Sequence, residues 1–286
     1  MKKFLWMFFL LSVFEVIPNA VTYKKNGGRL GDNLFSFSRA LWVSYMYGYP
    51  VVYNRFQYGE LLKLSRHPKY EIIKKHKKSV VIHNDVKSFF ANQDDEDMLY
   101  IVPWKAYLKI NWNDKKFIKV LKQEIALTNQ LPLLQLPPNR LPVAVHIRTG
   151  GGFDRIDIDK DLPNKFPPMS FFIEQLQRLS MMLKNQPLYV YVFTDSKEPE
   201  KLVDILKTQV KKTNIVYDYR SKTGQDAQSI LTDFFDMAQF QYFIRPQSFF
   251  SLMAEKLSEW KISISPRKSM WKNAELRVTE VTTLVR

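Results

Sequence analysis

The sequence predicts an α/β protein with two domains, each built on a parallel sheet wound by helices. The chain has 286 residues and is 45% hydrophobic, which suits two domains of roughly 120 to 150 residues. Short apolar runs rich in β-branched residues alternate with segments whose apolar residues recur at helical spacing. A proline-rich stretch, QLPLLQLPPNRLP, is typical of a linker. We therefore expect one domain over residues 21–140 and a second over residues 141–286.

The first domain opens with a strand and a helix joined by glycines. Val21 to Lys24 reads as a short strand, and Leu34 to Met46 carries apolar residues at helical spacing. Gly48 ends this helix, and residues 51–53 are expected to form the next strand. The intervening loop, GGRLGDN, offers N–H groups at a helix N-terminus, where phosphates bind. Its spacing is neither GxGxxG nor that of a Walker A loop.

The rest of the first domain is less informative. We expect a strand over Met98–Val102 and a helix over Asp114–Leu127. The basic run Lys74–Lys78 is typical of a solvated helix face.

The second domain alternates strands and helices, as a doubly wound parallel sheet does. Its first strand delivers His146 and Arg148 to three consecutive glycines, residues 150–152. Ligands of such sheets bind at the carboxyl ends of strands, where Asp195 and Ser248 also fall. The further elements are helices over 168–184, 198–211, 226–240 and 249–260, and strands over 188–193, 215–217 and 242–244.

Composition narrows the classes of partner and site. With 43 Lys+Arg against 28 Asp+Glu, the net charge is +15, which favours an anionic partner. Cysteine is absent, which excludes disulfides, thiolate metal sites and a cysteine nucleophile. The four histidines show no i,i+4 pairing, so we expect no zinc site.

The N-terminus MKKFLWMFFLLSVFEVIPNA resembles a signal peptide or an N-terminal anchor over residues 1–20. The apolar stretch Phe4–Phe14 is shorter than a membrane-spanning helix requires. A location outside the cytoplasm or at a membrane is expected. The alternatives are a first buried segment of the fold and a cytoplasmic location.

Four sequence blocks occur in one order: GRLGDNLF from Gly28, HIRTGG from His146, DFFDMAQFQYFIRPQSFFS from Asp233 and ISPRKSMW from Ile264. Together they resemble the fucosyltransferase superfamily that makes α-1,2 and α-1,6 linkages and modifies proteins with O-fucose, most closely its α-1,2 branch. That branch has Gly-Arg-Leu-Gly-Asn-Gln-Leu-Phe, His-x-Arg-x-x-Asp, Asp-x-x-x-Met with Asn-Ser-x-Phe-Ser, and a Pro-x-x-Trp-like element. The resemblance implies a GT-B-like fold of two Rossmann-like domains. It also implies inverting, metal-independent transfer of fucose from GDP-fucose to a glycan hydroxyl, without a cofactor.

The resemblance and the chemistry of the step suggest roles for single residues. Arg148 would pair with the β-phosphate of the departing GDP, and Asp154 would take the acceptor proton. Ser248 and the N–H groups at Phe249 and Phe250 would hold the same phosphate. His146 and Asp195 are candidates for the guanine or ribose. The residues expected to cover the pyrophosphate from the first domain are Gly28, Arg29, Gly31, Asp32 and Asn33.

Two departures from the family pattern bear on activity. The aspartate of His-x-Arg-x-x-Asp falls on Gly151, with Asp154 and Asp157 nearest, and the Asn-Gln of the first block is Asp32-Asn33. Three interpretations stay open for the first departure: Asp154 substitutes for the missing carboxylate, the acceptor differs, or the enzyme is inactive.

Two other functions compete with this interpretation. The segment Asp157–Asp161 contains two Asp-x-Asp matches, which a metal-dependent GT-A glycosyltransferase would use. A non-catalytic basic module that binds nucleic acid or glycan would interleave basic and aromatic residues along one face. The lysine runs lie away from the glycine loops, so we expect no nucleic-acid partner.

Overall fold

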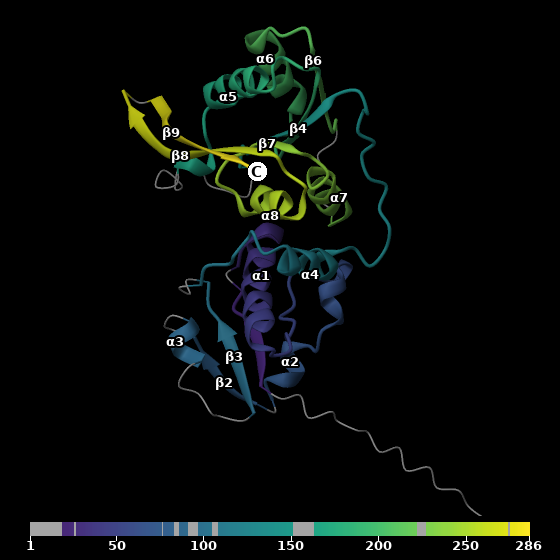
Figure 1. The fold of residues 1–286 in the computed structure, drawn as a ribbon, viewed down its shortest axis with the longest axis vertical. Coiled ribbons are helices and arrows are strands. Elements are labelled where there is room, and N and C mark those ends of the chain that lie inside the picture. Colours follow the sequence, from purple (N-terminus) through teal and green to yellow (C-terminus); the bar gives the residue numbers. More distant parts are fainter. Residues whose placement is uncertain are drawn as a thin grey trace, which may run out of the picture.

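The computed structural model of the chain describes residues 19–25, 27–75, 77–82, 86–90, 97–104, 108–150, 163–221, 227–273 and 275–286 (Figure 1). It contains a three-stranded sheet of order β1-β3-β2 and a six-stranded sheet of order β6-β5-β4-β7-β8-β9. The predicted α/β class with two predominantly parallel sheets is confirmed. Residues 1–18 of the leader expected over residues 1–20, the candidate base Asp154 and the Asp157–Asp161 motif lie outside the described residues. Ala20, the last residue of that expected leader, is instead a buried residue of the first strand. Within the described part of the chain, no helix is both long and apolar enough to cross a membrane.

The first sheet has β3 (Met98–Val102) between β1 (Ala20–Tyr23) and β2 (Lys78–Val81), all parallel. The strand expected over residues 51–53 does not form, and this prediction is wrong. Val51 makes a single parallel bridge to Val21, but Tyr53 bridges Lys69 instead, so no ladder builds up along β1. Helices α2 (Tyr70–Ile73) and α3 (Val86–Phe90) are short, with 3₁₀ turns at Gly59–Leu61 and Lys63–Arg66.

Helix α1 (Leu30–Tyr47) follows β1 and is buried along most of its length. It ends at Gly48, whose φ of 76° is left-handed and whose N–H donates to the Ser44 carbonyl at 2.8 Å. Helix α4 (Lys115–Ile125) begins at Asp114, whose carboxylate accepts from the N–H groups of Lys116 and Phe117 at 2.9 and 3.0 Å. Such an N-cap is worth about 1 kcal/mol. Both helix ends are therefore determined by local sequence.

The second sheet is centred on β4 (Leu141–Ile147), which pairs in parallel with β5 (Leu188–Thr194) and with β7 (Tyr242–Ile244). β6 (Ile215–Tyr219) pairs with β5, and β8 (Ile262–Lys272) pairs with β7. The last strand, β9 (Glu275–Val285), is antiparallel to β8 and was not predicted. Most side chains of this hairpin are partly or fully exposed, so it lacks the apolar run that marks a buried strand.

The helices of the second half are α5 (Met169–Met182), α6 (Pro199–Val210), α7 (Ala227–Met237) and α8 (Phe249–Leu257). Alternate residues of a strand point to opposite faces of the sheet. Accordingly Val143 and Val145 of β4 pack in a core with residues of α5 and α6, while Ala144 packs in the core that contains α7 and α8. The sheet is therefore covered on both faces, as the sequence predicts.

The core on the α7 and α8 side continues into the first half of the chain. Phe37 of α1 and Met253 of α8 belong to one buried cluster, and α1 lies directly beneath α8 in Figure 1. The proline-rich segment is tied to α7, because the Leu134 N–H donates to the buried Asp236 carboxylate at 2.7 Å. The junction between the two sheets is thus a packed helix pair, and it brings the N-termini of α1 and α8 together.

Candidate active site

Three polar residues directly follow parallel strands of the second sheet: Arg148 after β4, Asp195 after β5 and Arg245 after β7. The carboxyl ends of these strands meet at one edge of the sheet. Asp195 accepts from the Thr149 N–H at 2.6 Å and from its hydroxyl at 3.0 Å. This carboxylate therefore holds the chain just after Arg148. Its predicted contact with guanine or ribose stays a prediction.

Arg148 and Ser248, 100 residues apart, come together at this edge. The Arg148 guanidinium donates from Nη1 to the Ser248 hydroxyl at 3.5 Å and lies 5.6 Å from the centre of the Phe166 ring. Ser248 occupies the N-cap position of α8, but its side chain makes no capping hydrogen bond. The N–H groups of the first turn of α8 are therefore not satisfied by that side chain, and such groups can donate to an anion.

The N-terminus of α1 lies against the N-terminus of α8. A Cβ added to Gly31 would come within 2.3 Å of the Phe250 amide nitrogen and 2.6 Å of the Phe249 carbonyl carbon. Only glycine permits this approach of two backbones. Residues 31–33 were expected in a loop, but α1 begins at Leu30 and they form its first turn. The positive ends of two helix dipoles thus lie side by side.

Asn33 secures the chain just before α1. Its amide group donates to the carbonyls of Gly28 and Arg29 at 2.7 and 3.0 Å, and its Oδ1 is buried with no hydrogen-bond partner in the described part of the chain. Gly28 lies against the Asp32 side chain, which a Cβ at Gly28 would approach to 2.5 Å. The contacts of Asn33 and Asp32 orient the turn that carries Arg29.

His146 is buried, with 8% of its surface exposed, and lies within reach of the charges of three arginines. Burial, and then the positive charges of Arg148, Arg245 and Arg29, lower the pKa of its imidazole to about 3. The ring is therefore neutral at physiological pH. Its Nδ1 atom has no hydrogen-bond partner among the residues that the structure describes. Guanidinium groups from three separate segments thus act on one neutral ring.

Arg245 was not predicted as a site residue. It is 7% exposed, and its Nε lies 2.5 Å from Oε2 of Glu255, which is fully buried. Glu255 also accepts from Ser263 and Lys256, each at 2.6 Å. Although burial raises the pKa of Glu255, Arg245 and Lys256 together hold it below its usual value. The signal that could have revealed Arg245 is its place directly after β7, equivalent to that of Arg148 after β4.

Phe249 and Phe250 contribute apolar contacts through their side chains. The Phe249 ring lies 4.4 Å from Phe35 and 5.0 Å from Trp104, so it joins the two halves of the chain. The Phe250 ring lies 5.8 Å from His146 and 5.5 Å from Phe234. Both side chains therefore pack around the site and offer no polar group to a ligand.

Solved structures resemble the fold of this chain over most of its length. NodZ α-1,6-fucosyltransferase soaked with GDP-fucose matches 93% of this chain and 99% of its own at 12% identity, with a TM-score of 0.52. Fucosyltransferase NodZ from Bradyrhizobium matches with 13% identity over the same shares and a TM-score of 0.52. A mutant of Arabidopsis thaliana FUT1 in complex with GDP matches 86% of this chain and 70% of its own, with 12% identity and a TM-score of 0.55. The chain has the fold of the solved fucosyltransferases.

This fucosyltransferase fold agrees with the GT-B-like architecture that the sequence blocks imply. No family model matches the sequence. No curated protein matches it significantly. At 12–13% identity the likeness establishes the fold alone, so the roles of single residues rest on the geometry of this chain.

The predicted site residues fall into three groups on this fold. Residues of the α1 turn, the end of β4 and the start of α8 come together, as expected: Gly28, Arg29, Gly31, Asp32, Asn33, His146, Arg148, Ser248, Phe249 and Phe250. Asp195 lies at the same sheet edge but is bonded to Thr149. Asp154 lies outside the described residues. Among the residues that are described, no three His, Asp or Glu side chains gather as a metal site would require.

Proposed function

We propose that the chain is a glycosyltransferase that moves fucose from GDP-fucose to a hydroxyl of a glycan. The observation that carries the proposal is the meeting of the α1 and α8 N-termini at Gly31, with Arg29 and Arg148 acting on the buried neutral His146. Such a place suits the pyrophosphate of a nucleotide sugar. Support also comes from solved proteins of this fold, which were soaked with GDP-fucose or hold GDP.

In the proposed reaction the acceptor oxygen forms a bond to the anomeric carbon while the bond from that carbon to the phosphate oxygen breaks. The electron pair leaves with GDP, so negative charge grows on the β-phosphate. Arg148 can meet this charge with two parallel N–H groups, and the Ser248 hydroxyl lies beside it at 3.5 Å. Donors already in place are worth most in the transition state, because no reorganisation is needed then.

The acceptor proton must pass to a base as the new bond forms. We propose a carboxylate for this step, with Asp154 as the candidate. Inversion, independence of metal and an α-1,2-like linkage are further proposals that the sequence blocks support. Association with a membrane or export through residues 1–20 is a proposal from the sequence of that segment.

The test of the donor is thermal unfolding with GDP, GDP-fucose and UDP-sugars. A ligand that binds only the folded state stabilises it by about 2.7 kcal/mol at one hundred times its Kd. We expect GDP and GDP-fucose to raise the melting temperature and UDP-sugars to leave it unchanged. A shift with UDP-sugars and none with GDP would refute the donor assignment.

A further inference from the structure

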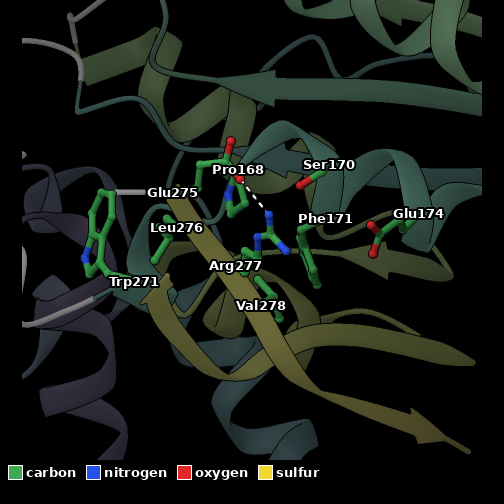
Figure 2. A pocket seen from close by; sticks show the side chains of 9 residues that line it. All are labelled: Pro168, Ser170, Phe171, Glu174, Trp271, Glu275, Leu276, Arg277 and Val278. Carbon is green, nitrogen blue, oxygen red and sulfur yellow. Dashed lines mark hydrogen bonds and ion pairs between the residues drawn. The ribbon is translucent and has the colours of Figure 1, made fainter. Parts of the chain in front are cut away.

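A groove of about 800 Å³ lies between the start of α5 and the β8–β9 hairpin (Figure 2). Pro168, Ser170 and Glu174 line it from the side of α5, and Trp271 and Arg277 line it from the hairpin. Figure 2 shows Trp271 at one end of the groove and Glu174 at the other. Neither end includes Arg29, Arg148 or Arg245, the arginine cluster whose charges act on His146.

The exposed indole of Trp271 distinguishes this groove. The residue is 54% exposed on a strand that extends from the sheet, although a covered indole would gain from burial of its apolar area. Contiguous apolar surface rimmed by polar residues marks binding sites. Leu276 and Val278, both half-buried, line the groove together with Trp271, and the buried Phe171 lies beneath them. The groove thus combines an exposed indole with further apolar surface.

The polar groups of the groove favour a neutral, hydroxyl-rich ligand. Glu174 and Glu275 supply carboxylates, Ser170 a hydroxyl and Arg277 a guanidinium. Arg277 lies 2.8 Å from Glu275, so two acids offset one base in a chain of net charge +15. Carboxylates repel phosphates and sulfates but accept hydrogen bonds from sugar hydroxyls. A sugar ring also presents an apolar C–H face that can cover an indole.

The groove is linked to the arginine cluster through Asn164, in the 3₁₀ turn Pro163–Lys165. The Asn164 side chain donates to the Arg267 carbonyl at 3.0 Å and accepts from the Ser269 hydroxyl at 2.6 Å, both on β8. The backbone carbonyl of Asn164 accepts from the N–H of Gln247 at 2.9 Å, and Gln247 is one residue before Ser248. The hairpin is therefore tied to the loop that carries a proposed phosphate ligand.

The groove and the Arg148 guanidinium are linked by a short stretch of chain. Phe166, whose ring lies beside the Arg148 guanidinium, is two residues before Pro168. Two residues span at most about 7 Å. The wall of the groove at Pro168 therefore lies close to the segment that carries Phe166, against which the Arg148 guanidinium packs.

We infer that this groove binds the glycan acceptor, through sugar residues beyond the one that receives the transferred sugar. The acceptor role rests on the proposed function. The charge balance excludes an acidic partner as the favoured occupant, and continuity with the Arg148 end favours the acceptor over an unrelated ligand.

The inference is tested on the full chain with a printed panel of neutral gluco-, galacto-, manno- and N-acetylglucosamine tetrasaccharides. Heparin and an oligonucleotide form the anionic arm of the panel. The neutral glycan retained best is then titrated calorimetrically into wild type, Trp271→Ala and Met270→Ala. Met270 is a matched control because it is 43% exposed beside Trp271 and does not line the groove.

We expect Trp271→Ala to weaken binding of the neutral glycan on the order of tenfold and Met270→Ala to leave it unchanged. Glu174→Gln at the other end should weaken binding several-fold, with circular dichroism confirming that each variant folds. With GDP-fucose, Trp271→Ala should raise the acceptor KM more than it lowers kcat, because the indole is proposed to bind sugar residues beyond the one that receives the transferred sugar.

Several outcomes overturn the inference: no neutral glycan is retained, or its binding is the same in Trp271→Ala and wild type. Binding of heparin or the oligonucleotide that requires Trp271 also overturns it. So does a wild-type dimer that Trp271→Ala converts to a monomer in size-exclusion chromatography, because a second copy then occupies the groove.

The GDP thermal shift separates the proposed donor from the proposed acceptor groove. Glycan binding that requires Trp271 without a GDP shift refutes the donor assignment and the acceptor role, whereas a GDP shift without such binding refutes the groove alone.

Discussion

His146, on β4, and Arg148, directly after β4, differ in exposure and in charge. His146 is neutral because burial, and then three neighbouring guanidiniums, lower the pKa of its imidazole. Arg148 is partly exposed and reaches the Ser248 hydroxyl. A charged side chain that binds a ligand must remain accessible to it. A neutral ring can be buried beside that side chain at a lower cost. Each residue leads to a prediction.

Replacing His146 should reduce the loss of unfolding free energy that occurs as the pH falls. The imidazole pKa is about 3 in the folded chain and about 6.5 when unfolded, so it is neutral in both states above that range. As the pH falls below about 6.5, only the unfolded chain takes up the proton, and the free energy of unfolding drops by up to about 1.4 kcal/mol per pH unit. We expect urea unfolding between about pH 7 and about pH 4.5 to show a shallower decline in His146→Gln than in wild type.

The matched control for this measurement is His67→Gln. His67 is partly exposed and is hydrogen-bonded to Glu124 at 2.8 Å. It should retain most of the wild-type decline. Identical profiles for His146→Gln and wild type would show that the imidazole is not held neutral by burial.

Arg148→Lys should fold but turn over slowly. Lysine keeps the charge and loses the planar pair of N–H donors, so the proposed reaction should lose on the order of 2 to 4 kcal/mol of transition-state stabilisation. The kcat of fucose transfer is compared with that of Arg178→Lys, an exposed arginine on α5 for which the same change should cost under about 0.5 kcal/mol. A folded Arg148→Lys with wild-type turnover would remove this residue from the mechanism.

At the scale of elements, the site depends on two helices that meet at their N-termini. Glycine in the first turn of a helix normally costs stability relative to alanine. At Gly31 the order is reversed, because the backbone of α8 occupies the space that a Cβ would need. The close packing of α1 on α8 therefore sets the geometry of the proposed phosphate site.

Gly31→Ala should destabilise the chain by about 1 to 3 kcal/mol, the usual cost of overpacking, and should also weaken GDP binding. Gly48→Ala is the control. Its added methyl meets nothing within 4 Å, but its φ of 76° makes the change costly by about 1 kcal/mol without any effect on GDP. Denaturant unfolding and GDP titration of both variants check this pair. Unchanged GDP affinity in Gly31→Ala would separate the α1–α8 contact from ligand binding.

At the scale of the whole molecule, the two sheets share a core. The buried cluster runs from Val21 on β1 through Phe37 and Met253 to Phe243 on β7. Separate domains often unfold in separate steps. Here the halves cannot part without exposing the apolar faces of α1 and α8.

We therefore expect thermal unfolding of the described halves as one cooperative transition. Differential scanning calorimetry should give one peak, with the calorimetric enthalpy close to the van't Hoff enthalpy. Two resolved peaks, or a ratio well above one, would show that the shared cluster does not couple the halves.

The sequence by itself determined most of the elements and the sheet edge at which several candidate site residues lie. The apolar run of β4, the helical spacing in α1 and the glycine that ends α1 are local patterns, and each corresponds to a feature of the structure. The rule that ligands lie at strand ends correctly brought together Arg148 and Ser248, 100 residues apart. These predictions succeed because hydrophobic periodicity and backbone capping act over a few residues.

Only the tertiary structure decided which charges are buried and which backbones touch. In the sequence Arg245 is one basic residue among many, but folding places it against Glu255 and beside His146. Residues 51–53 have strand-forming side chains, yet the partner of Tyr53 is Lys69 rather than β1. The β8–β9 hairpin is exposed beyond the buried start of β8, so its outer part has no buried apolar run that could predict it. Each of these features depends on contacts between distant segments, and local patterns carry no information about which segments will meet.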